Sequence, residues 1–272
     1  MSSSTKKSLG MWSGSSSGVR VNHYRVWRNL LVAGLMVAGF VALAQGPTAA
    51  SPVETCLAAN RNLSLGTALP HTAARLNAGG PLKVVALGSS STSGLWVLNR
   101  AATYPEVMRR ELARIRPDLE FEVLNRGRIG DTIGRTLARL PGEVLSHGPD
   151  LVVWQLGTND VVWGGKADGL KTQVVQGVRI LKSGGTELVL MDLQYTPAVL
   201  ASFHHSAMQA IIADAAREEH IGLFSRFDLM RRSIKAGIAP NALVSWDGLH
   251  NSADGYECIG KALARAIYAA AR

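Results

Sequence analysis

Cysteine and aromatic residues are scarce in this sequence. Only 2 of the 272 residues are cysteines, and 6% are aromatic. Two cysteines are too few for a disulfide-rich scaffold, and no group of Cys, His, Asp and Glu has the spacing of metal ligands. Hydrophobic residues still make up 47% of the chain, which is enough to bury a full core. The composition therefore predicts one domain of about 200 residues with additions, and it indicates neither a metal nor another cofactor.

Acidic residues are absent from the first 44 positions, which carry five basic residues and end in an apolar run from Leu30 to Ala44. This run has 15 residues, whereas a membrane-spanning helix needs about 20. With the small-x-small sequence Ala42-Leu43-Ala44, the segment is typical of a cleaved secretory signal peptide over residues 1–44. An uncleaved anchor at the outer face of the membrane is the alternative. Both interpretations export the domain to the periplasm or the medium.

Export changes how the charge and the cysteines are interpreted. Five of the 29 Lys and Arg precede Gln45, so the remaining chain has 24 basic and 20 acidic residues, or +4. No basic cluster is interleaved with aromatics, so no nucleic-acid partner is expected. Contact with a membrane is expected only through an uncleaved leader. Cys56 and Cys258 form an even pair, which in an exported chain permits a disulfide, and two unrelated thiols are the alternative.

Apolar runs of strand length alternate with amphipathic stretches from Leu82 onward. The runs are "LKVVALG", "FEVLN", "DLVVWQLG", "ELVLMDLQ" and "IGLF". Between them, apolar residues spaced three and four apart indicate helices with one buried face. Uninterrupted apolar strands are buried on both sides, so the pattern predicts a parallel sheet between two helical layers, a three-layer α/β/α sandwich. Residues 45–80 lack such periodicity, and we expect a surface lead-in with one short helix before a domain over 81–272.

Residues with catalytic chemistry occupy the loops where an open parallel sheet binds ligands, after the carboxyl ends of its strands. The loops contain the sequences "GSSST" from residue 88, "NRGRIGD" from 125, "GTND" from 157 and "DGLH" from 247. A serine becomes a nucleophile when a histidine takes its proton and a carboxylate orients that histidine. Asp247 and His250 are three residues apart, so one turn can join them. Gly130 and Asn159 offer N–H donors to an oxyanion, so the loops predict acyl transfer.

In order and position, these four loops resemble the sequence blocks of the SGNH hydrolase superfamily, also called GDSL esterases and lipases, over about residues 82 to 270. The resemblance implies a flavodoxin-like parallel sheet. It implies Ser90 as nucleophile with Asp247 and His250, and an oxyanion hole of Gly130, Asn159 and the backbone N–H of Ser90. It also implies a metal-independent serine hydrolase.

One position departs from the family pattern, because Ser89 stands where the family usually has Asp. Considered without the alignment, Ser89 and Ser91 are as eligible as Ser90. A phosphate-binding loop is disfavoured because Gly94 is not followed by Lys. A helix cap is the alternative role for Asn159. The alternative for the Asp247–His250 segment is a surface turn.

The resemblance implies an exported enzyme that cleaves esters of short acyl chains, lipids or acetylated sugars. Two alternatives retain the same fold. One is an exported acyltransferase with the same residues, and the other is an inactive domain that binds a glycan or lipid. The sequence leaves the acyl chain, the alcohol and the oligomeric state open.

Processing of the leader gives the first testable prediction. The mature protein should begin at Gln45, because signal peptidase cleaves after small residues such as Ala42 and Ala44. Amino-terminal sequencing of the exported protein measures this. Retention of residues 30–44 in the exported protein would favour the anchor.

Overall fold

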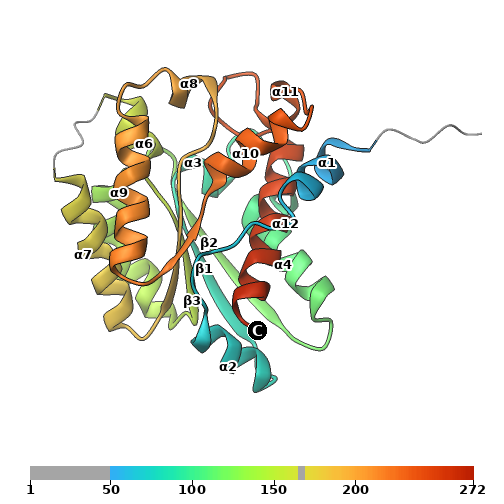
Figure 1. Cartoon of the computed structure of the whole chain (residues 1–272). Helices are drawn as coiled ribbons and strands as arrows, with labels where there is room; N and C mark the ends of the chain where they lie inside the picture. The colour runs from blue at the N-terminus through green and yellow to red at the C-terminus, as the bar shows by residue number, and fades with distance from the viewer. Residues whose placement is uncertain (1–49, 165–168) are drawn as a thin grey trace, which may run out of the picture. The chain divides into compact units, whose positions relative to one another are not determined.

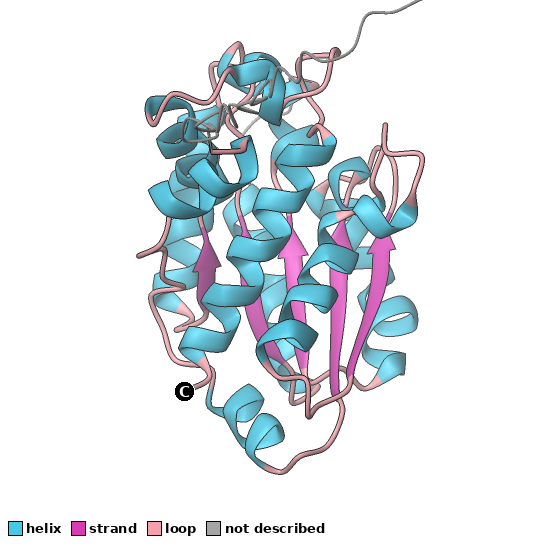
Figure 2. Ribbon diagram, turned by 90° about the vertical axis from the view of Figure 1, so that its right-hand side faces the viewer, coloured by secondary structure: helices cyan, strands magenta, loops and turns pink. Residues whose placement is uncertain are grey.

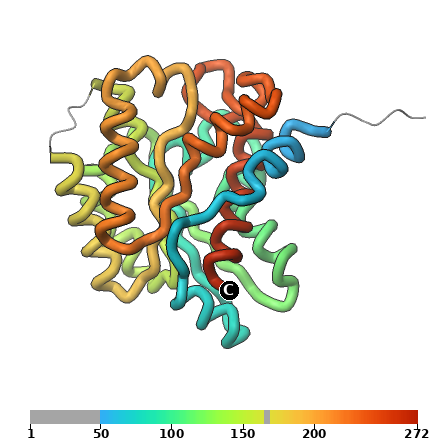
Figure 3. Tube along the Cα trace, in the orientation of Figure 1, coloured from blue at the N-terminus to red at the C-terminus, as the bar shows by residue number. Residues whose placement is uncertain are grey.

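The computed structural model describes residues 50–164 and 169–272, so the expected signal peptide lies outside the described residues. These described residues form one compact unit built on a parallel sheet of order β2-β1-β3-β4-β5 (Figure 1), and Figure 3 traces the path of the chain through it. The strands are β1 (Leu82–Gly88), β2 (Phe121–Gly127), β3 (Leu151–Gln155), β4 (Glu187–Met191) and β5 (Gly222–Phe224). This order is that of flavodoxin-like sheets, so the predicted fold class is confirmed.

Helices connect the strands and cover the sheet. They are α1 (Pro52–Ala59), α2 (Pro70–Asn77), α3 (Ser90–Ser93), α4 (Tyr104–Ile115), α5 (Ile133–Arg139), α6 (Thr158–Val162), α7 (Leu170–Ser183), α8 (Pro197–Leu200), α9 (His205–Glu218), α10 (Arg226–Lys235), α11 (Pro240–Leu243) and α12 (Ala253–Ala270). Short 3-10 or π turns occupy Arg100–Ala102, Leu140–Val144 and Leu145–His147. Within the described ranges, no helix combines the length and apolarity that a membrane crossing requires.

The strands alternate their side chains between two apolar clusters, one on each face of the sheet. In β1, Val84 and Ala86 join the cluster that contains α4 and α12, while Val85 and Leu87 join the cluster that contains α7 and α9. Figure 1 shows these helix pairs on opposite sides of the sheet. Because both faces of the sheet are buried, the side chains on both sides of a central strand are apolar. This explains the uninterrupted apolar runs.

The helices approach closely where a glycine removes the side chain. A Cβ on Gly260 of α12 would lie 2.6 Å from the Cβ of Val107 in α4. All strands run in the same direction, so their carboxyl ends meet at one edge, where the loops gather (Figure 2). The two helical layers therefore leave this edge as the place where the motif loops come together.

Residues 50–80 differ from the expected surface lead-in. They form two helices, α1 and α2, and bury Cys56, Leu65, Leu69 and Leu76 in the core around α4 and α12. The N–H of Leu69 donates to the carbonyl of Ala270 at 2.8 Å. Each short element contributes only one or two buried residues, so no periodicity marked the segment. The boundary expected at residue 81 therefore divides parts that share one core.

A disulfide joins α1 to α12. Cys56 and Cys258 are bonded, with their Cα atoms 6.2 Å apart and 202 positions apart in the sequence. Both side chains are fully buried, in the same cluster as the apolar face of α12. The bridge therefore closes almost the whole described chain into a loop and fixes the amino-terminal helix to the last one.

Removal of this disulfide by substitution gives the second prediction. Closing a loop of this length stabilises the folded state by about 5 kcal/mol in the chain-entropy model. The Cys56→Ala, Cys258→Ala double variant should therefore lose about 3 to 5 kcal/mol in free energy of unfolding, as measured by urea denaturation. Mass spectrometry of the exported protein without reductant should show the cross-linked pair. Two freely alkylated thiols would contradict the prediction.

Candidate active site

Ser90, His250 and Asp247 form a hydrogen-bonded row at the carboxyl edge of the sheet. The Oγ of Ser90 lies 2.7 Å from Nε2 of His250, and Nδ1 of His250 lies 2.5 Å from Oδ2 of Asp247. Ser90 is 5% exposed and His250 7%, so both side chains are almost fully buried. The structure therefore brings together three residues that are up to 160 positions apart.

The neighbouring serines point elsewhere. Both the N–H and the hydroxyl of Ser89 donate to Oε1 of Gln155, at 2.9 and 3.0 Å. The hydroxyl of Ser91 is the acceptor of a 3.5 Å bond from Gln194. Of the three serines, Ser90 alone faces the imidazole. The side-chain geometry thus distinguishes hydroxyls that the residue types leave equivalent.

Ser90 is placed by a tight passage from β1 into α3. It is the first residue of α3, and the first N–H groups of a helix have no partner within that helix. The helix presses against the end of β2, where a Cβ on Gly127 would lie 2.1 Å from the backbone N of Ser93. Glycine at this position is therefore required for α3, and with it the serine, to sit beside the sheet.

Asp247 receives four N–H donors. Its Oδ1 accepts from the backbone N–H groups of Leu249 and His250, both at 3.0 Å. Its Oδ2 accepts from the imidazole of His250 and, at 2.7 Å, from the indole Nε1 of Trp96. Partial burial raises the pKa of Asp247, but the bonds from His250, Leu249 and Trp96 outweigh it and lower the pKa to about 2. The carboxylate is therefore charged at any pH where a histidine is a base.

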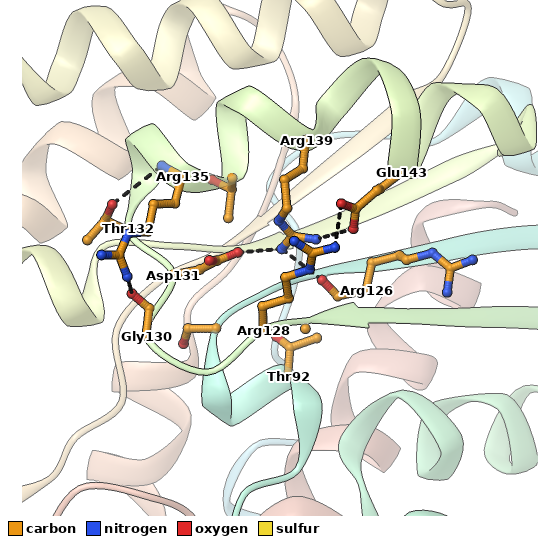
Figure 4. Close-up of polar contacts among 12 residues, drawn as sticks. Thr92, Arg126, Arg128, Gly130, Asp131, Thr132, Arg135, Arg139 and Glu143 are labelled. Atoms are coloured by element: carbon orange, nitrogen blue, oxygen red, sulfur yellow. Dashed lines mark hydrogen bonds and ion pairs between the residues drawn. The ribbon is translucent and has the colours of Figure 1, made fainter.

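Polar contacts surround the turn that contains Gly130 (Figure 4), and Asn159 of α6 bonds to the same turn. The carbonyl of Gly130 accepts from Nη1 of Arg135 at 3.0 Å, and Nη2 of Arg139 pairs with Asp131 at 2.5 Å. The Nδ2 of Asn159 donates to the carbonyl of Asp131 at 2.8 Å. An amide nitrogen carries two hydrogens, so Asn159 keeps a second donor for a ligand. The contacts hold the Gly130 turn, whose φ is +81°.

Asp160 braces the same region and does not join the Ser90 row. Its carboxylate accepts the N–H of Ile133 at 3.2 Å, at the first residue of α5. Burial raises the pKa of Asp160, which the bond from Ile133 opposes. The N–H groups of a helix start favour a negative charge, so this contact fixes α5 beside β3. Asp160 therefore has a structural role next to Asn159.

Three buried polar residues that the sequence analysis did not single out support the site. Gln155 accepts from Ser89, as described above, and from Thr92 at 3.1 Å. Gln194 donates to the carbonyl of Leu249 at 3.2 Å, directly before His250, and accepts from Arg226 at 2.6 Å. The available signal was a glutamine that ends an apolar run, as in "VVWQLG" and "LMDLQ". For Arg226, no sequence pattern gave a signal.

No set of three or more His, Cys, Asp and Glu residues in the described part of the chain is arranged to hold a metal ion. The polar groups at the carboxyl edge instead form a nucleophile, a base, a carboxylate and N–H donors. Such a set can add a serine oxygen to a carbonyl and stabilise the resulting negative charge.

The sequence profile of the non-GDSL lipase-like family matches residues 55–272. The chain belongs to the non-GDSL lipase-like family. The resemblance to SGNH hydrolases is thereby confirmed.

Relatives of this non-GDSL lipase-like chain include characterised and solved proteins. An arylesterase from Vibrio mimicus is 30% identical over 115 residues, 42% of this chain and 56% of that relative. The match thus spans about half of the curated relative's length. TesA matches with a TM-score of 0.58 and 21% identity, over 66% of this chain and 95% of TesA. The acetylxylan esterase Axe2 from Geobacillus stearothermophilus gives 0.59 and 21%, over 69% and 95%. The two solved structures share the fold.

The contact between Gly127 and α3 gives the third prediction. Gly127→Ala places a methyl group against backbone atoms of Ser93, which cannot yield as a flexible side chain can. The substitution should cost about 1 to 3 kcal/mol in free energy of unfolding. Gly142→Ala is the control, because a Cβ there meets nothing within 4 Å. Urea denaturation compares the two, and equal stabilities would contradict the prediction.

Proposed function

We propose that this protein is an exported serine ester hydrolase in which Ser90 is the nucleophile, His250 the general base and Asp247 the residue that orients His250. The observation that carries the proposal is the hydrogen-bonded row from Ser90 Oγ through His250 to Asp247. A serine, a histidine and a carboxylate in this order activate an alcohol for attack on an acyl carbon. The names of the relatives support the same reaction class, since they include an arylesterase and an acetylxylan esterase.

In the acylation step, Ser90 Oγ attacks the ester carbonyl while its proton moves to Nε2 of His250. The carbonyl oxygen becomes an oxyanion, and the N–H groups of Ser90 and Gly130 and the amide of Asn159 donate to it. The bond to the alcohol oxygen then breaks. His250 returns its proton to this oxygen, the free alcohol leaves, and Ser90 carries the acyl group.

Deacylation repeats these events with water. His250 takes a proton from the water molecule as its oxygen attacks the acyl carbon. The bond to Ser90 Oγ breaks, the proton returns to Ser90, and the carboxylic acid leaves. The ionised Asp247 stabilises the imidazolium in both halves of the reaction, because Oδ2 accepts the proton on Nδ1.

Export is supported by two independent features. The buried Cys56–Cys258 bridge is of the kind that forms and persists in oxidising compartments. The leader over residues 1–44 has the charge and apolar pattern of a signal peptide. We place the periplasmic or secreted domain after Gln45, with the segment over 45–80 as part of it.

The substrate is proposed to be an ester with an apolar acyl or alcohol group. Six exposed large apolar side chains in the described residues lie between the carboxyl end of a strand and the helix that leads to the next strand: Trp96, Leu98, Ile129, Trp163, Leu200 and Phe203. Large exposed apolar surface marks binding sites more often than chance exposure does. Short-chain esters, lipids and acetylated sugars all present such a group beside the ester.

The fourth prediction tests the nucleophile. Ser90→Ala should lower turnover of a nitrophenyl ester by several orders of magnitude, because among the described residues Ser90 carries the hydroxyl that bonds to the His250 imidazole. His250→Ala should be nearly as severe, and the double variant little worse than either. Asn159→Ala should cost about 10² to 10³ in rate. The wild-type rate should rise with pH as His250 loses its proton, because only the neutral imidazole can accept the proton of Ser90.

Ser89→Ala and Ser91→Ala are matched controls and should keep most of the activity. A fluorophosphonate probe should label Ser90 in the wild-type protein, and peptide mapping identifies the site. Label on Ser89 or Ser91 would contradict the assignment. Transfer of the acyl group to an added alcohol in preference to water would identify an acyltransferase. A folded protein that reacts with no ester or probe would indicate a binding domain.

A further inference from the structure

Trp96 has an unusual backbone conformation close to the proposed triad. Its φ is +71°, and only one other non-glycine residue, His220, has a positive φ in the ranges that the structure describes. A bulky side chain is disfavoured in this left-handed region and persists there only where its surroundings hold it. Trp96 follows the left-handed Gly94, the residue that ends α3. The turn thus carries its indole away from the path of β1 and α3.

The indole of Trp96 reaches the carboxylate of Asp247. Its Nε1 donates to Oδ2 at 2.7 Å, across 151 positions of sequence. The other three donors to this carboxylate come from Leu249 and His250, within the same turn as Asp247. Trp96 therefore supplies the donor from outside this turn, from the segment that contains Ser90.

A second tryptophan packs against the first. The ring centroids of Trp96 and Trp246 lie 5.1 Å apart with planes at 56°. Trp96 is 51% exposed and Trp246 81%, so the pair covers the outer side of Asp247 without closing it off. The described residues show no side-chain hydrogen bond from Trp246. The two indoles thus have similar surroundings, but one of them bonds to the carboxylate.

We propose that Trp96 is a positioning residue that holds the Asp247 carboxylate in the orientation required by His250. The role rests on the proposed function, since it acts through His250 as general base. Oδ2 accepts from two donors at once, and the indole fixes where its lone pairs point. Without the indole, Oδ1 keeps its two backbone bonds, but Oδ2 loses the donor that holds it in place beside His250.

The direction of the pH effect follows from charge. Without the indole, Oδ2 is free to turn away from Nδ1 of His250, so the carboxylate stabilises the imidazolium less. The base then loses its proton at a lower pH. The titratable groups that face Asp247 are His250 on its own turn and Tyr256 on α12. Burial raises the pKa of Tyr256 well above its usual value, so this phenol stays neutral through the range where histidine titrates.

The fifth prediction uses Trp96→Phe, which keeps an aromatic ring and removes the N–H. Its kcat for a nitrophenyl ester should fall about tenfold, as expected for loss of a hydrogen bond to a charged acceptor. KM should stay within about twofold. The pH midpoint of kcat/KM should move down. Trp246→Phe, the control, should leave the pH midpoint at its wild-type value.

A double-mutant cycle with Asp247→Ala separates positioning from a general effect of the loop. In the Asp247→Ala background, Trp96→Phe should cause no further loss in kcat, because the acceptor is gone. An equal loss in both backgrounds would overturn the proposal. An active wild-type enzyme with an unchanged Trp96→Phe profile would also overturn it, while leaving the proposed function intact.

A measurement on the wild-type protein covers the case in which Trp96→Phe does not fold. The indole N–H resonance of Trp96 should shift with the same pH midpoint as kcat/KM, since Oδ2 is shared with the imidazole. A resonance that stays constant through this midpoint would overturn the proposal. A wild-type protein that hydrolyses no ester and binds no fluorophosphonate would instead overturn the proposed function, and the role of Trp96 with it.

Discussion

The common direction of the strands is the constraint on which the site depends. Because β1, β2 and β3 are parallel neighbours, the loops that follow them leave the sheet at one edge. Ser90, Gly130 and Asn159 lie in the segments that directly follow these strands, and the turn before α12 returns His250 to the same edge. A pair of antiparallel strands would send one of these loops to the opposite end. The parallel sheet therefore brings residues that are far apart in the sequence to one edge, which no local sequence feature could do.

Buried polar groups hold these loops with specific bonds. Gln155 at the end of β3 and Gln194 after β4 are almost fully buried, and both bond to residues next to Ser90 or His250. Arg226 is also buried, and burial lowers its pKa to about 10, so it remains charged at neutral pH. It donates to the carbonyl of Asp192 at 2.8 Å and to Gln194. If one partner is removed, another buried polar group is left without a hydrogen bond, and only one arrangement of the loops satisfies all of them. The network therefore contributes more to the fixed geometry of the loops than to net stability.

Ser89 shows how a departure from a family pattern can keep its local structure. The GDSL pattern has an aspartate at this position. Here the shorter side-chain hydroxyl and the backbone N–H of Ser89 both donate to Gln155. The same Oε1 also accepts from Thr92, so one glutamine holds both ends of the turn. The loop therefore keeps three bonds to β3 without an acid next to the proposed nucleophile.

The sequence by itself determined the layered α/β fold, because strands buried on both faces must be apolar throughout and helices with one buried face must repeat every three to four residues. The resemblance in motif order and spacing also predicted Ser90, Asp247 and His250 as a triad, and the structure places these three side chains in one hydrogen-bonded row. Tertiary structure decided the rest. The packing of residues 50–80, the pairing of Cys56 with Cys258 and the bond from Trp96 to Asp247 join positions far apart in the chain. Such contacts depend on how the elements pack around the sheet, and no local periodicity records that packing.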